Sequence, residues 1–234
     1  MQTGFLDRSI VSAGKRYPYQ VYVPSNYDAS RAWPVVLFLH GAGERGDDGL
    51  LQTTVGIAAA IRRYPERFPA LVVMPQAPRD SFWSGPPGDA AIAALDRTCE
   101  EFNADATRIY LTGLSMGGHG SWHLAYHHTG RFAAALVICG FAGDRPNRPS
   151  LVPPGEGTAH QRMAARIKKL PIWIVHGEAD SLVPVADSRL MAEALRAADA
   201  YVHYTELPGT DHDSWTPTYA SESIIHWLFA QRSG

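Results

Sequence analysis

The chain has 234 residues, 45% of them hydrophobic, so it is long enough to bury a substantial core. Its formal net charge is −2 and it has no basic run, which argues against a nucleic-acid partner. No segment approaches the roughly 20 apolar residues of a membrane span, so no membrane partner is expected either.

The N-terminal segment and the cysteines bear on the cellular compartment. Residues 1–7 lack the basic region and apolar core of a signal peptide, so we expect a cytoplasmic protein. Cys99 and Cys139 both lie in apolar surroundings, and the chain has no C-x-x-C pair. They therefore fit reduced, buried thiols better than a disulfide framework or a metal site.

Apolar runs and helical periodicity alternate along the whole chain. The strands are predicted at residues 6–11, 17–23, 34–39, 70–74, 108–112, 133–139, 172–176 and 201–207. The helices are predicted at residues 54–64, 89–102, 118–128, 160–169, 185–198 and 217–232. This alternation predicts an α/β fold with a mostly parallel sheet of about eight strands and helices on both faces.

Local signals add detail to this outline. Gly14 and Lys15 suit a hairpin turn, so the first two strands should form an antiparallel edge of the sheet. Asp89 is the predicted N-cap of the second helix. The helix at 185–198 is expected to turn Leu190, Ala194 and Ala197 toward the core.

Residues 140–157 form the only long irregular stretch that we predict. We interpret it as a loop insertion and not as a linker, because the strand–helix rhythm resumes after it, which favours one domain over residues 1–234. From Phe141 onward it holds four prolines and three glycines with no helical apolar stripe, so no large lid domain is expected. Without a lid, the functional site, whose residues are given below, should stay open to water, with Arg145 or Arg148 on its rim.

Residues 113–117, Gly-Leu-Ser-Met-Gly, match G-x-S-x-G, the sharp strand-to-helix turn called the nucleophile elbow. A predicted strand precedes the motif and a predicted helix follows it, which is the context that the motif requires. Gly113 and Gly117 flank Ser115 because a Cβ at either position would collide with neighbouring backbone. Ser115 is thus the candidate nucleophile.

A serine nucleophile needs a base to take its proton and an acid to orient that base. Asp180 and His212 each follow a predicted strand, and the order Ser115, Asp180, His212 is that of α/β-hydrolases. Glu178, Asp144 and Asp187 compete with Asp180 for the role of the acid. Asp211 and Asp213 flank His212 and are interpreted as loop hydrogen bonders.

An oxyanion hole needs two backbone N–H groups aimed at one oxygen. Met116, directly after the nucleophile, should supply one, and Ala42 in the glycine-rich loop after the third strand should supply the other. Glu44 and Arg45 either pair and fix this loop or are solvated. The loop lacks G-x-x-x-x-G-K and G-x-G-x-x-G, which argues against a nucleotide.

Taken together, these motifs resemble the α/β-hydrolase superfamily, and within it the compact serine carboxylesterases of the dienelactone-hydrolase, feruloyl-esterase and predicted-peptidase group. The resemblance covers about residues 5 to 230. It is carried by residues 40–46, 74–76 with Trp83, 113–118, 176–180 with Val183 and Pro184, and the late His212. Dienelactone hydrolases carry cysteine at the elbow, so Ser115 argues against that particular activity.

The sequence therefore predicts a serine carboxylesterase that hydrolyses soluble short-acyl or aromatic esters through an acyl-enzyme. Trp83, Phe82 and Phe141 are candidates to line the substrate pocket, although as large apolar residues they also suit the core. No cofactor and no metal is expected, because the histidines after the elbow lack acidic or cysteine ligands at suitable spacing. A small ester is the expected partner, and the oligomeric state stays open. The alternatives are a serine peptidase of similar fold and a non-catalytic binding protein.

Overall fold

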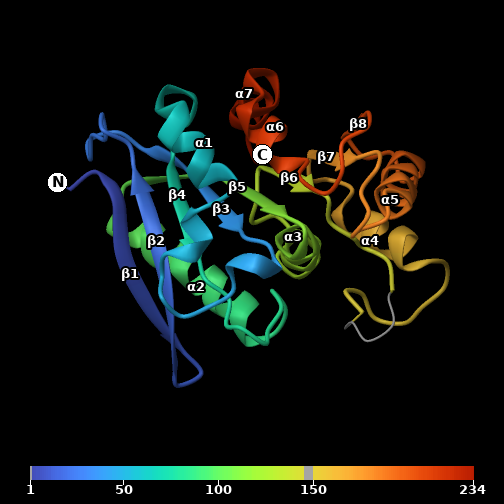
Figure 1. The fold of residues 1–234 in the computed structure, drawn as a ribbon, viewed down its shortest axis with the longest axis horizontal. Helices are drawn as coiled ribbons and strands as arrows, with labels where there is room; N and C mark the ends of the chain where they lie inside the picture. Colours follow the sequence, from blue (N-terminus) through green and yellow to red (C-terminus); the bar gives the residue numbers. More distant parts are fainter. Residues whose placement is uncertain (1, 145–149) are drawn as a thin grey trace.

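A computed structural model describes residues 2–144 and 150–234. Its centre is one sheet of eight strands, the predicted number, and their order is β1-β2-β4-β3-β5-β6-β7-β8 (Figure 1). The strands are β1 (Gly4–Ser12), β2 (Lys15–Val23), β3 (Trp33–Leu39), β4 (Leu71–Pro75), β5 (Ala104–Leu114), β6 (Ala134–Ile138), β7 (Ile172–Gly177) and β8 (Val202–Leu207).

The direction of the strands follows from their connections. β2 is antiparallel to both β1 and β4, while every other neighbouring pair is parallel. The β1–β2 turn takes positive φ angles, 49° at Ala13 and 74° at Gly14, a combination suited to a tight hairpin. β3, β4 and β6 are buried at every residue, as expected of apolar strands covered on both faces. β8, at the far edge, is only half-buried throughout.

Helices cover both faces of the sheet (Figure 1). One face packs against α2 (Pro86–Glu101), α3 (Met116–His127), α4 (Ala159–Ile167) and α5 (Ala186–Ala197). The other packs against α1 (Ile57–Arg63), α6 (Trp215–Ala220) and α7 (Glu222–Ala230). Because strand side chains alternate between the faces, each face has its own apolar core.

Three local predictions were wrong. α2 begins at Pro86, after Gly85 with φ 61°, so Asp89 lies inside the first turn and is not the N-cap. The single C-terminal helix is two helices, interrupted at Ser221, whose backbone is extended. Of the three α5 residues expected inside, Leu190 is 51% exposed, Ala197 is also exposed, and Ala194 is half-buried. The buried stripe is Ser188, Met191, Ala192 and Leu195.

The irregular stretch contains no helix in its described parts, residues 140–144 and 150–157. It is nevertheless attached to the core, because Leu151 and Val152 are 3% and 2% exposed. Arg145 and Arg148, the expected rim residues, lie outside the described residues.

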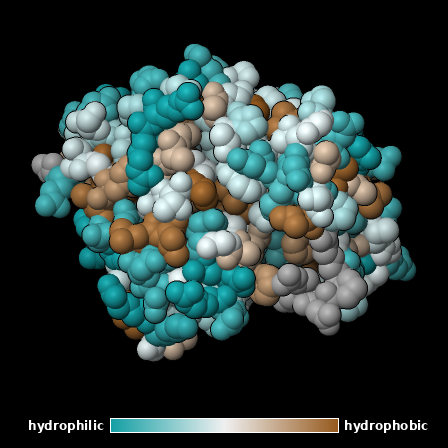
Figure 2. Space-filling model, viewed as in Figure 1, coloured by the Kyte–Doolittle hydropathy of each residue, from teal (hydrophilic) through white to brown (hydrophobic). Residues whose placement is uncertain are grey.

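The surface carries no single extended apolar face in the view of Figure 2, where small apolar patches alternate with hydrophilic side chains. Both cysteines are free; Cys139 is buried and Cys99 is half-buried. Within the described residues, every helix is too short or too polar to cross a membrane.

Candidate active site

Ser115 stands at the tight turn where β5 passes into α3. Its φ of 54° and ψ of −115° lie in a region that L-residues seldom adopt. Two backbone bonds hold it there: its N–H donates to Ile138 O at 2.9 Å, and its carbonyl accepts from His119 N at 3.0 Å. The strained backbone is thus fixed between the neighbouring strand and the first turn of the helix.

The glycines around Ser115 allow the elbow to form. A Cβ on Gly117 would lie 1.9 Å from Leu39 O, and one on Gly113 would lie 2.3 Å from Gly117 O. Side chains at these positions would therefore push α3 away from β3 and β5. The collision with backbone expected from the sequence is present at both positions.

His212 reaches Ser115 from the loop after β8. Its Nε2 lies 2.9 Å from Ser115 Oγ, and its Nδ1 lies 2.7 Å from Asp180 Oδ2. An ionised carboxylate only accepts hydrogen bonds, so Nδ1 carries the ring proton. Nε2 is then left to accept the hydroxyl proton of Ser115. The structure thus brings the three predicted residues, from three separate loops, into one hydrogen-bonded chain.

The Asp180 carboxylate has more hydrogen-bond partners than the side chains of Ser115 and His212. The Asp180 side chain is 0% exposed, and each carboxylate oxygen lies within hydrogen-bond distance of two donors. Oδ1 accepts from Leu182 N at 2.9 Å and Val183 N at 2.8 Å. Oδ2 accepts from His212 Nδ1 and lies 3.1 Å from His176 Nε2. The sequence analysis included His176 in a motif but gave it no role.

The other acids that were considered have different partners. Asp187 accepts from Ala142 N at 2.7 Å, Glu178 from Gly209 N at 2.9 Å, Asp144 from Ser150 Oγ at 2.6 Å, Asp211 from Ser181 N at 2.8 Å, and Asp213 from Thr216 N at 3.0 Å. Of these, Asp211 also accepts from the backbone N–H of His212, at 2.8 Å. Asp211 and Asp213 thus order the loop, as expected of them.

The loop after β3 lies against the elbow. A Cβ on Gly41 would lie 2.9 Å from a side-chain carbon of Leu114. Ala42, in the short 3-10 helix Ala42–Glu44, is exposed beside this contact, and Met116 opens α3. The first amides of a helix have no partner within the helix, so the Met116 N–H is available to an acceptor.

Several side chains bind the backbone of the loop after β3. Arg45 Nε donates to Ala42 O at 2.9 Å, so Arg45 fixes the loop by binding its backbone. Gln76, a motif residue without an assigned role, accepts from Gly49 N at 2.7 Å and donates to Glu44 O at 3.1 Å. Burial raises the pKa of Glu44, whose carboxylate accepts from the Gly41 N–H.

His40 and Trp83 support the same loop from the core. Burial lowers the pKa of His40 to about 4, so its neutral Nε2 accepts from Ala77 N at 2.9 Å. The Trp83 indole N–H donates to His40 O at 3.0 Å. Trp83 is only 1% exposed, so it is placed to support the loop and not to line an open pocket.

The two phenylalanines of the expected pocket differ in their surroundings. Phe141 is 7% exposed and stacks on His119 in α3, with ring centroids 4.1 Å apart. His119 Nδ1 also lies 3.1 Å from Phe141 O, so this loop is held against the helix that begins at the elbow. Phe82 is partly buried and packs against the core on the α2 side.

Three metal-ligand atoms meet at this site, from Cys139, Asp180 and His212, all within 4.8 Å of one another. Their chemistry does not favour a metal. Burial raises the pKa of Cys139 to about 12, whereas thiols bind metals as thiolates. The Asp180 oxygens and both ring nitrogens of His212 already have hydrogen-bond partners.

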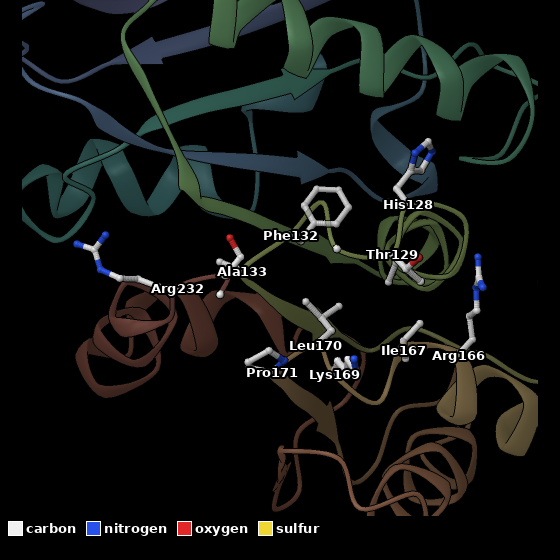
Figure 3. Close-up of a pocket in the computed structure, with 14 residues that line it drawn as sticks. His128, Thr129, Phe132, Ala133, Arg166, Ile167, Lys169, Leu170, Pro171 and Arg232 are labelled. Carbon is white, nitrogen blue, oxygen red and sulfur yellow. The ribbon is translucent and has the colours of Figure 1, made fainter.

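A separate pocket of about 640 Å³ lies at the opposite ends of the strands, near the starts of β6 and β7 (Figure 3). Phe132 and Leu170 contribute to its apolar lining, and Arg166 and Arg232 extend at its margins. These arginines lie at or just beyond the C-terminal ends of α4 and α7, where cations offset the partial negative charge of a helix. In parallel sheets, ligands bind at the carboxyl ends of the strands, which is where Ser115 lies.

Comparison with known sequences identifies the family. Residues 10–218 match the sequence family described as "Putative esterase". The chain belongs to this esterase family. Its fold is of the α/β-hydrolase type, as the sequence motifs predicted.

Several individual proteins are similar to this esterase. A solved thermostable esterase is 36% identical with a TM-score of 0.83, over 97% of this chain and 63% of its own length. A ferulic acid esterase from Anaeromyces mucronatus, solved in complex with ferulic acid, has 21% identity and a TM-score of 0.71, over 96% and 90% of the two chains. An uncharacterised secreted protein from Arthroderma benhamiae is 24% identical over 80% of this chain, which spans only 22% of that protein.

Proposed function

We propose that this esterase is a serine carboxylesterase that works through an acyl-enzyme, with Ser115 as nucleophile, His212 as general base and Asp180 as the acid that orients it. The hydrogen-bonded chain Ser115–His212–Asp180 on a strained strand-to-helix turn is the observation that carries this proposal. A neutral imidazole 2.9 Å from the hydroxyl is within reach to take its proton as the oxygen attacks.

In the acylation step, Ser115 Oγ forms a bond to the ester carbonyl carbon while His212 Nε2 takes the hydroxyl proton. The carbonyl oxygen becomes an oxyanion, which accepts hydrogen bonds from the Met116 and Ala42 amides. Collapse of this intermediate breaks the bond to the alcohol oxygen, and His212 returns the proton to the departing alcohol. Asp180 stabilises the charged imidazole while it holds that proton.

Deacylation repeats these steps with water. His212 takes one proton from the water as its oxygen attacks the acyl carbon, and the same two amides hold the new oxyanion. The acyl–Ser115 bond then breaks, the serine oxygen regains its proton, and the carboxylic acid leaves. Each cycle therefore consumes one ester and one water and requires no cofactor.

The proposed substrates are soluble short-acyl or aromatic esters. The described parts of the irregular stretch after β6 contain no amphipathic helix to cover an apolar site. Its anchoring at Leu151 and Val152 also favours a mouth of fixed shape. Aromatic esters are included because the ferulic acid esterase with the same fold binds ferulic acid. For the compartment we keep a cytoplasmic location as the proposal.

Labelling with a fluorophosphonate tests the nucleophile. Wild-type protein should be labelled once, on Ser115, and should lose its hydrolysis of p-nitrophenyl acetate in step. Ser115→Ala should fold, escape labelling and lose about 10⁴-fold or more of kcat. A folded Ser115→Ala protein that keeps near wild-type turnover would refute the mechanism.

A substrate panel tests the class. The panel compares acetyl, butyryl, palmitoyl and feruloyl esters, a butyryl anilide, and tributyrin followed through its solubility limit. We expect the soluble esters to be hydrolysed without a rise in rate at the limit. Faster cleavage of the anilide would identify a peptidase, a preference for palmitoyl would identify a lipase, and the absence of turnover and labelling would identify a binding protein.

A further inference from the structure

His176, at the end of β7, lies on the far side of Asp180 from His212. It is 0% exposed, and its Nε2 lies 3.1 Å from Asp180 Oδ2 and 2.9 Å from Val183 O. Its Nδ1 lies 2.7 Å from the hydroxyl oxygen of Ser188 in α5. Both ring nitrogens are therefore used, although the proposed reaction involves neither of them.

The partners fix the protonation of this ring. Burial lowers the pKa of His176, so the ring is neutral at pH 7 and carries one N–H. The Val183 carbonyl can only accept, so the proton lies on Nε2, where it is shared between Val183 O and Asp180 Oδ2. Nδ1 must then accept from the Ser188 hydroxyl, which holds the ring in the tautomer and orientation that donate to Asp180.

We propose that His176, with its ring held by Ser188, is a positioning residue that fixes the Asp180 carboxylate against His212 and shares its negative charge. This inference rests on the proposed serine hydrolase function. A hydrogen bond from a neutral donor spreads the charge of Oδ2, which would otherwise act on His212 alone. The buried acid is thereby held in one rotamer by donors on both sides.

Other groups near His176 do not replace it. Glu206, opposite His176 in β8, accepts from Arg189 and from the Tyr204 hydroxyl, so its charge is already paired. The remaining charged or titratable neighbours of His176 are Asp180 and His212 themselves. Ser188 Oγ also lies 3.4 Å from Gly140 O, which is too long to compete with the 2.7 Å bond to His176.

The test compares His176→Leu, His176→Gln and Ser188→Ala in ester hydrolysis across pH. Leucine removes the donor, glutamine retains an N–H near the position of Nε2, and alanine removes only the hydroxyl that donates to Nδ1 and holds the ring. Ile174→Val is the matched control, because Ile174 is a 0% exposed residue of the same strand whose aliphatic side chain cannot form a hydrogen bond in this network. Circular dichroism and thermal unfolding report the fold of each variant.

For His176→Leu we expect kcat to fall about 10- to 100-fold, with KM changed less than about threefold. The acid limb of kcat/KM should move to higher pH by about half a unit to one unit, because Oδ2 then acts on His212 with undivided charge. His176→Gln should recover most of kcat and the wild-type midpoint. Ser188→Ala should lower kcat and move the acid limb to higher pH, as His176→Leu does, but by less. Ile174→Val should change neither kcat nor the acid limb.

A folded His176→Leu protein with wild-type kcat and acid limb would overturn the inference, as would a glutamine variant no better than leucine. If the leucine variant does not fold, Ser188→Ala decides, and an unchanged acid limb there counts against the proposal. Fluorophosphonate labelling of Ser115 distinguishes failure of the proposed function from failure of the role proposed for His176. Without Ser115-dependent turnover in the wild type, the proposed function itself fails. With it, these variants test His176 alone.

Discussion

The carboxylate of Asp180 has no exposed surface, and at the residue scale this burial determines its role in the site. A buried carboxylate is costly unless donors surround it, and here two backbone amides and two imidazoles do so. Asp213 presents the contrast. Its carboxylate accepts from Thr216 N and Thr216 Oγ1 at the exposed start of α6, which is an ordinary capping arrangement.

These environments predict different outcomes for the same substitution. Asp180→Asn replaces an acceptor of the His212 proton with a neutral amide, and we expect kcat to fall by up to about 10⁴-fold. Asp213→Asn keeps a good capping side chain and should change kcat by less than about threefold. Kinetics of both variants on one soluble ester provide the measurement. A larger loss in Asp213→Asn would mean that the acid is wrongly assigned.

His40 makes folding dependent on pH. Burial holds its pKa at about 4 in the folded protein, against about 6.5 for a free histidine. Between these values the unfolded chain binds a proton that the folded protein does not, so stability falls as pH falls. From pH 7 to pH 5 this residue alone should lower the free energy of unfolding by about 2 kcal/mol.

Urea unfolding of the wild type and His40→Asn at pH 7 and pH 5 measures this contribution. The variant should be less stable at both values, because the bond from Ala77 N is altered. Its loss of stability between them should be smaller by about 2 kcal/mol. An equal loss in both proteins would show that His40 does not titrate in this range.

The sequence predicted the residues of the site better than their supports. Ser115, Asp180 and His212 could be found because a motif and the strand ends place them at one edge of a parallel sheet. The bonds from His176 and Ser188 to this site could not be predicted. His176 ends an apolar strand and Ser188 lies in an amphipathic helix, and periodicity does not identify the partner that a buried polar side chain finds.

At the scale of elements, α3 and the end of β3 approach more closely than a methyl group allows. Gly117 creates this contact, since its Cβ would lie 1.9 Å from Leu39 O. The contact brings the first turn of the helix against the loop that carries Ala42. Both amides proposed for the oxyanion therefore depend on one packing distance between two elements.

Substitution of Gly117 tests this dependence. Gly117→Ala should destabilise the protein by more than about 4 kcal/mol or prevent folding, because backbone has to move. Gly43→Ala is the matched control, since a Cβ there meets no atom within 4 Å, and its stability should change by less than about 1 kcal/mol. Urea unfolding of both variants is the measurement, and similar stabilities would contradict the packing argument.

The wrong predictions for elements have physical causes. The buried stripe of α5 includes Ser188, and a polar residue in that stripe moved the predicted face toward Leu190. The start of α2 was missed although a signal was present, because proline is favoured in the first turn and Pro86 follows a glycine. The break at Ser221 leaves little trace in the sequence, since both helices continue the same apolar pattern.

For the whole molecule, the sheet joins parts of unequal stability. Ser115 follows β5, which has a strand on each side, whereas His212 follows β8, which pairs only with β7. No residue of β8 is fully buried. Segments with few buried contacts open first in native-state fluctuations, so the edge that carries the base should open before the centre that carries the nucleophile.

Activity and secondary structure should therefore be lost at different urea concentrations. Ester hydrolysis should decline below the transition seen by far-ultraviolet circular dichroism, and the β8 amides should exchange with deuterium faster than those of β5. Coincident curves for activity and circular dichroism would mean that the edge unfolds only with the rest.

The half-buried edge strand also determines how lost activity should return. When only β8 and the loop after it have separated, the rest of the sheet still holds Ser115 in place. Re-pairing one short strand is a local event that takes microseconds to milliseconds, much faster than refolding a chain of this size. A sample inactivated by mild urea should thus recover within the mixing time on dilution, whereas one taken past the main transition should recover slowly and incompletely.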